Sequence, residues 1–115
     1  MEKEFVPFAE SVELRNLGFD ELSIASYYND GEFTYYLNVD GKRQGYNCIL
    51  APLYQQAFGW LYKKTNKWII PIPNDDKIGE WYASGISYKT YEEAEIACLR
   101  KLIEIVKEQN KTKID

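Results

Sequence analysis

Hydrophobic residues recur at helical spacing in three stretches of the chain. The first follows Pro7, which suits a helix start because its missing N–H has no intrahelical partner there, and it should end at Gly18 in a left-handed turn with Phe19 packed on Leu14. The second opens at residues 51–52 and carries one apolar stripe. That stripe consists of Leu53, Tyr54, Ala57, Phe58 and Leu61.

A capping box, Thr90-Tyr91-Glu92-Glu93, predicts the start of the third helix, with the Thr90 hydroxyl accepting a hydrogen bond from the N–H of Glu93. Apolar residues cover nearly half of the helix circumference from there to about Glu108. We therefore expect this segment to be the main helix against the sheet.

Between the helices the pattern changes to a period of two, which is typical of strands. Residues 22–28 and 33–39 alternate on either side of an Asn-Asp-Gly turn sequence, which predicts a hairpin. The expected core face is the one that carries Val39. Tyr27 and Tyr36 then fall on the outer face.

Two further strands are expected after the second helix. Residues 68–73 contain two prolines, which remove ladder donors and therefore predict an edge strand. Residues 80–88 alternate as one last strand, with Gly85 at a bulge or at the close approach of another backbone. The order of elements predicts an α+β fold with one antiparallel sheet of about four strands and helices mainly on one face.

The length of 115 residues is close to the commonest domain size. Residues 1–110 are expected to form a single α+β domain and residues 111–115 a frayed polar tail. The chain shows no secretory signal and no apolar run near the roughly 18 residues of a membrane span, so we expect a cytoplasmic protein without a membrane partner. Cys48 and Cys98 are far apart and are expected to be free thiols.

Composition shifts the expectation from catalysis toward binding. The chain has no histidine, ten tyrosines and three tryptophans. Histidine is the side chain that most readily exchanges protons near neutral pH, whereas Tyr and Trp provide large, stiff contact surfaces. The net charge of −4 argues against general nucleic-acid binding, although Lys42 with Arg43, and Lys63, Lys64 and Lys67, form local basic groups.

No catalytic residue, metal site or cofactor is expected from the motifs. Cys98 lies on an apolar helix face and Cys48 has no histidine to activate it. Asp75 and Asp76 lack the glycine-spaced loop of a calcium site, and no glycine-rich phosphate loop is present.

Glu95 is the most unusual single residue, because it projects from the apolar face of the last helix near Cys98. A carboxylate taken out of water needs a partner or a raised pKa. It can lie at the rim of the core beside a surface lysine, or it can be a functional carboxylate facing a pocket. A tyrosine hydroxyl, a tryptophan N–H or Arg15 could serve as its partner.

The aromatic residues are the other candidates, either as core or as contact surface. Ten tyrosines exceed what a small core needs, and a buried unpaired hydroxyl costs about 1–3 kcal/mol. The candidate ligand or partner contacts are Trp60, Tyr62, Lys63, Lys67, Trp68, Trp81, Tyr82, Tyr27, Tyr36 and Glu95.

Three segments, EFVPFAESVELRNLGFDE, APLYQQAFGWLYKK and TYEEAEIACLRKLIEIVKEQ, occur in the order seen in one group of proteins. The chain resembles small uncharacterised phage, prophage and mobile-element proteins of gut-type bacteria. Residues 27–48 depart from the pattern of that group. The resemblance implies a cytoplasmic accessory protein acting in phage–host conflict, and it carries over no functional residue.

Three hypotheses follow. The first is a non-catalytic accessory protein that binds a host protein or a small nucleotide-like or aromatic ligand, such as a nucleotide immune signal, with a pocket formed by homo-oligomerisation. The second is a structural or interaction module of a larger assembly without a small ligand. The third is a hydrolase or transferase built on Glu95 and tyrosines. A ligand binder should show an enclosed pocket with two or more aromatic rings and a cation, and an assembly module a broad exposed apolar patch.

Overall fold

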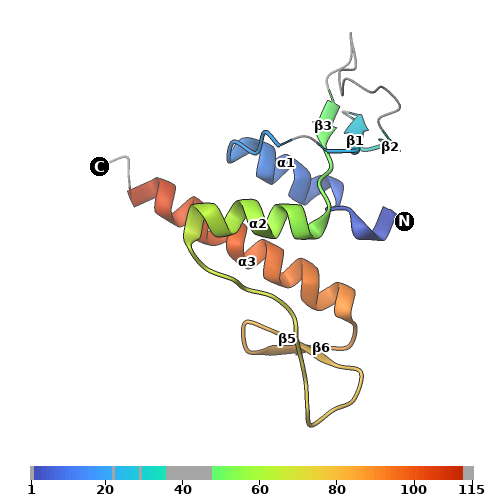
Figure 1. Ribbon diagram of the computed structural model, residues 1–115, viewed down its shortest axis with the longest axis vertical. Helices are drawn as coiled ribbons and strands as arrows, with labels where there is room; N and C mark the ends of the chain where they lie inside the picture. Colours follow the sequence, from blue (N-terminus) through green and yellow to red (C-terminus); the bar gives the residue numbers. More distant parts are fainter. Residues whose placement is uncertain (1, 22, 29, 36–47, 113–115) are drawn as a thin grey trace. The chain divides into compact units, whose positions relative to one another are not determined.

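A computed structural model describes residues 2–21, 23–28, 30–35 and 48–112 (Figure 1). Within these residues the chain forms one 3-10 turn, three α-helices and six short strands. The helical elements are η1 (Glu2–Glu4), α1 (Phe8–Asn16), α2 (Tyr54–Thr65) and α3 (Tyr91–Thr112). The strands are β1 (Ala25–Tyr28), β2 (Phe33–Tyr35), β3 (Cys48–Leu50), β4 (Ile72–Pro73), β5 (Trp81–Ala83) and β6 (Ile86–Tyr88).

The strands pair into two antiparallel sheets of three, with the orders β2-β1-β3 and β4-β5-β6. The α+β class and the antiparallel pairing are confirmed. The single sheet of about four strands is not confirmed, for two reasons. β3, which lies outside the four stretches predicted as strands, pairs with β1, and residues 80–88 divide into β5 and β6 instead of forming one strand.

The chain divides into two compact units, residues 1–57 and residues 58–115. The boundary falls inside α2, and each unit holds one of the two sheets. A single domain over residues 1–110 stays a prediction. None of the helices in the described stretches combines the length and the apolar character needed to cross a membrane.

The end of α1 confirms the predicted left-handed stop. The N–H of Phe19 donates to the carbonyl of Leu14 at 3.0 Å, and the N–H of Gly18 donates to that of Arg15, also at 3.0 Å. These two bonds define a Schellman motif, and Gly18 has the positive φ of 100° that the motif requires. Leu14 and Phe19 are both buried.

The core of the first unit lies on the face of its sheet that carries Tyr27. This core consists of Phe5, Ala25, Tyr27, Ile49 and Ala51, with Phe8, Val12 and Phe33 packed against it. The prediction that Tyr27 lies on the outer face is wrong, since its side chain is only 4% exposed while that of Ile24 is 63% exposed. Burial of Tyr27 is tolerated because its hydroxyl donates a hydrogen bond to the carbonyl of Val6. Tyr36 lies outside the described residues.

The peptide group of Val6 joins distant segments of the first unit. Its N–H donates to the carbonyl of Pro52 at 2.8 Å. Its carbonyl accepts from the hydroxyl of Tyr27 at 2.9 Å and from the hydroxyl of Ser11 at 3.1 Å. Val6 is fully buried, so these bonds satisfy both of its backbone polar groups out of contact with water.

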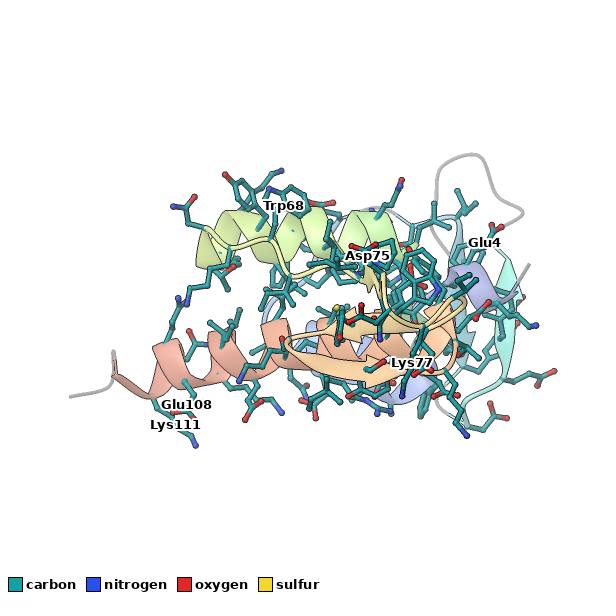
Figure 2. The ribbon with its side chains drawn as sticks, turned by 90° about the horizontal axis from the view of Figure 1, so that it is seen from below. Glu4, Trp68, Asp75, Lys77, Glu108 and Lys111 are labelled. Carbon is teal, nitrogen blue, oxygen red and sulfur yellow. The ribbon has the colours of Figure 1, made fainter. Side chains whose placement is uncertain are left out.

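In the second unit, β5 and β6 pack against α3 (Figure 1). Thr90 caps α3 as predicted, because its hydroxyl accepts from the N–H of Glu93 at 3.1 Å. The helix continues to Thr112 and so extends past the expected end at Glu108, where an ion pair between Glu108 and Lys111 spans the last turn (Figure 2). Buried residues of α3 are Ala94, Cys98, Leu99, Leu102, Ile103 and Val106, all on the predicted apolar face.

The turn between β5 and β6 replaces the predicted bulge. Ser84 and Gly85 both have positive φ, at 52° and 85°, which is the conformation of a two-residue type I′ hairpin turn. Ser-Gly is a weaker signal for this turn than Asn-Gly, which is why the alternation over residues 80–88 indicated one continuous strand.

Two glycine substitutions should change stability in opposite directions. Gly85→Ala places a Cβ at positive φ and should cost about 1–2 kcal/mol. Gly59→Ala lies inside α2, where no described atom lies within 4 Å of the new Cβ, and should stabilise by up to about 1 kcal/mol through helix propensity. Urea unfolding followed by circular dichroism measures both changes. A loss of stability in Gly59→Ala would show that another group packs closely on this helix position.

The shared carbonyl of Val6 predicts non-additive behaviour of its two donors. Tyr27→Phe and Ser11→Ala should each cost about 1 kcal/mol, because each leaves one hydroxyl on the carbonyl. The double variant should cost more than the sum, because the buried carbonyl then loses both side-chain donors. A double-mutant cycle by urea unfolding tests this, and strict additivity would contradict it.

Candidate functional site

A row of exposed apolar side chains follows α2. Trp68, Ile70 and Ile72 are 57%, 50% and 58% exposed, whereas Ile69 and Pro71 between them are less exposed. Exposure with a period of two indicates that these three side chains lie on one side of an extended segment. We call Trp68, Ile70 and Ile72 the Trp68 strip.

The first residue of the strip is held by α2. The ring of Trp68 stacks on that of Tyr62, with a centroid distance of 4.6 Å and an interplanar angle of 16°. Stacking covers one face of the indole and leaves the rest of the side chain open to solvent. The strip therefore begins with an aromatic ring whose orientation is set before any partner arrives.

Three exposed lysines lie immediately before the strip, and we call Lys63, Lys64 and Lys67 the lysine group. The Nζ atom of Lys64 lies 5.1 Å from the ring centroid of Trp60, within the range of a cation–π contact. The side chain of Trp60 is buried, so it adds no exposed apolar surface, and it matters here only because its ring contacts the exposed Lys64. Lys42 and Arg43 lie outside the described residues.

β4 is an edge strand, as the two prolines predict, although it is shorter than residues 68–73. The N–H of Asn74 donates to Glu80, so the pair two residues away, Ile72 with Tyr82, is also hydrogen-bonded. By alternation, Pro71 and Pro73 face the free edge. The edge of β4 therefore offers no N–H donor at either position to an added strand.

Hollows lined by described residues include the following two. One, of about 280 Å³, is lined by Pro73, Asn74, Asp75, Ile78, Gly79, Glu80 and Trp81. The other, of about 310 Å³, is lined by Ser11, Arg15, Phe19, Asp20 and Leu50. The first holds one aromatic ring and two acids, and the second one aromatic ring, one cation and one acid. Neither has the two aromatic rings and a cation expected of a pocket for a nucleotide-like ligand.

Asn74 is bound to its own surroundings rather than presented to a ligand. Its side-chain amide donates to Ser87 at 3.2 Å, its carbonyl oxygen accepts from the N–H of Asp76 at 3.0 Å, and Ser87 donates to Glu80 at 3.0 Å. This network closes the loop between β4 and β5, where Figure 2 places Asp75 and Lys77. Across the described ranges, no three Cys, Asp or Glu side chains are grouped so that they could hold a metal ion.

Glu95 is half-buried on α3 and accepts a hydrogen bond from the hydroxyl of Tyr91, one turn earlier. Its partner is thus a tyrosine, one of the expected partners, rather than a surface lysine. Burial raises the pKa of Glu95 above 4.5, the charge of Glu92 adds to the increase, and the Tyr91 bond opposes it. Burial, together with the charge of Glu95, likewise raises the pKa of Tyr91.

Trp81 and Cys98 complete the surroundings of this pair. The ring of Tyr91 meets Trp81 edge to face at a centroid distance of 5.0 Å. Burial and the charge of Glu95 raise the pKa of Cys98 to about 11, which makes its thiolate scarce near neutral pH. Glu95 lines neither of the two hollows. The cluster therefore consists of side chains at which the β5–β6 hairpin meets α3, and Glu95 is the one half-buried acid among them.

Some of the residues predicted to contact a ligand or partner lie together in the structure, and the other described ones lie elsewhere. Tyr62 and Trp68 are in contact, and Lys63 and Lys67 are exposed beside them. Tyr27 is a core residue, Tyr82 is half-buried in β5, and Trp81 and Glu95 belong to the cluster on α3. Sequence reasoning missed Ile70 and Ile72, although the alternation of apolar residues with prolines over residues 68–73 was a signal for them.

Comparison of the chain with protein-family models, with curated proteins and with solved structures found no match. The resemblance to phage and mobile-element proteins therefore stays a prediction.

The raised pKa of Glu95 predicts a pH dependence of stability. Folding favours the neutral carboxyl, so this contribution is full below pH 4.5 and is lost as pH rises through the folded-state pKa. Glu95→Gln stays neutral and can still accept from Tyr91. Its stability relative to the native chain should rise between pH 4 and pH 7, measured by urea unfolding. Glu104→Gln, exposed on the same helix, controls for loss of a surface charge, and an equal gap at both pH values would refute the prediction.

Proposed function

We propose that this chain is a non-catalytic interaction module that binds a partner protein through the Trp68 strip. The observation that carries the proposal is the row itself: three large apolar side chains, each at least half exposed, in consecutive outward positions. Such a row gains free energy when a partner removes it from water, at about 25 cal/mol per Å² of apolar surface buried. Scattered single apolar residues are normal at surfaces, but an ordered row marks a contact site.

The stacked pair of Tyr62 and Trp68 supports the same conclusion. Tryptophan and tyrosine are enriched among residues that dominate binding energy at protein interfaces. The indole of Trp68 is already oriented by Tyr62, so little side-chain freedom is lost when a partner covers it. Trp68 is therefore the anchor of the proposed interface.

A protein partner is favoured over the nucleotide-like ligand for reasons of shape. Neither of the two hollows described above contains more than one aromatic ring, and none of the three strip side chains lines either of them. An exposed row suits an opposing surface, which can cover all three side chains at once. The predicted resemblance to phage and mobile-element proteins would place such a partner in the host cell.

The donor-free edge of β4 bears on self-association. Pairing of two copies through this edge would need N–H groups that Pro71 and Pro73 do not have. A homo-oligomer, as proposed from the sequence, is therefore not expected to form by extension of the sheet at β4.

The test places a photo-crosslinking amino acid at position 70 in the native host cell, with position 86 as the matched control. Both isoleucines are exposed and lie in the same unit. We expect one protein to be crosslinked from position 70 and not from position 86. That protein, once purified, should bind Trp68→Ala at least about tenfold more weakly than the native chain, while Ile86→Ser binds as the native chain does.

Three outcomes would overturn the proposal. They are the absence of a protein adduct at position 70, the same adducts from positions 70 and 86, and crosslinking only to a second copy of the chain.

A further inference from the structure

We infer that the partner segment is acidic at the end that meets the lysine group and apolar where it covers the Trp68 strip. This inference rests on the proposed function and adds the chemistry of the partner.

Charge is segregated around the strip. The chain as a whole has 18 acidic and 14 basic residues. Between residues 48 and 74 the sequence contains three lysines and not one Asp or Glu. All three are exposed and make up the lysine group. An acidic protein thus presents its apolar row next to a local excess of positive charge.

Local hydrogen bonds hold the lysine group against the strip. The hydroxyl of Thr65 donates to the carbonyl of Leu61 at 2.8 Å and accepts from the N–H of Lys67 at 3.1 Å. Asn66 takes a positive φ of 58° at the turn, and its N–H donates to Tyr62 at 2.7 Å. Thr65 is buried. The backbone that links α2 to Trp68 is therefore fixed, and Lys67 is placed beside the indole.

The helix dipole accounts for only part of this arrangement. Lys63 and Lys64 lie in the last turn of α2, where cations interact favourably with the exposed carbonyls. Lys67 lies beyond the helix, and the dipole does not explain why acids are absent over the whole stretch. Complementarity to an anionic partner accounts for the position of Lys67 beyond the helix and for the absence of acids from residues 48–74.

The strip has opposite charges at its two ends. Its first residue follows the lysine group, and its last residue precedes Asp75 and Asp76, both exposed. A uniformly anionic surface, such as a membrane or a nucleic acid, would be repelled at the second end. A protein segment with acids at one end and apolar residues after them fits the whole strip.

The experiment selects binders for the full chain from a random peptide library displayed on phage. The native chain should enrich sequences that join an acidic cluster to apolar residues. The triple variant Lys63→Glu, Lys64→Glu, Lys67→Glu should lose that preference and should bind the selected peptide about tenfold or more weakly. The control Lys77→Glu, Lys89→Glu, Lys101→Glu changes net charge equally at exposed positions and should select and bind as the native chain does.

The outcomes separate this inference from the proposed function. If Trp68→Ala abolishes binding of the selected peptide while the triple variant at the lysine group and an increase in salt do not weaken it, the inference fails and the proposed function stands. If neither the triple variant nor Trp68→Ala weakens binding, both fail. Enrichment without acids, an equal effect of the control, or tighter binding to phosphatidylglycerol vesicles or to a single-stranded oligonucleotide would also overturn the inference.

Discussion

The first unit depends on one buried peptide group. Val6 is fully buried, and an unpaired carbonyl or N–H in that position would cost a large fraction of the stability of a small protein. Pro52, Ser11 and Tyr27 satisfy both of its groups, and they come from three different segments. Because Pro52 is tied in this way, the chain enters α2 two residues later from a fixed position.

Features set by short-range chemistry could be predicted from the sequence. The Schellman end at Gly18 and the cap at Thr90 involve residues within five positions of one another, and both occur as expected. Features set by long-range pairing could not be predicted. Tyr27 is buried because Ile49 pairs with it and the carbonyl of Val6 accepts a hydrogen bond from its hydroxyl, and neither contact is visible in the local alternation.

The same division applies to the candidate site. Tyr62 and Trp68 are close in sequence, and the structure stacks them. Ile70 and Ile72 are exposed although an apolar run ordinarily indicates a core strand, and only Ile72 and Pro73 of that run form β4, at the edge of its sheet. Trp60, by contrast, points inward from the helix that presents Tyr62 outward. The composition shows that the chain is rich in aromatic residues, but it does not show which of their rings remain exposed in the fold.

An exposed apolar row on an edge strand is normally a hazard, because free N–H groups next to it invite pairing with another strand. Here the two residues that would carry those outward donors are prolines. The segment thus keeps apolar side chains exposed while its backbone offers no outward N–H at Pro71 or Pro73 to an added strand. If Pro71 and Pro73 served only to end the strand, burial of Ile70 and Ile72 would be the simpler solution. Under the proposed function, the exposure of Ile70 and Ile72 beside a blocked edge leaves recognition to side chains and not to backbone pairing at β4.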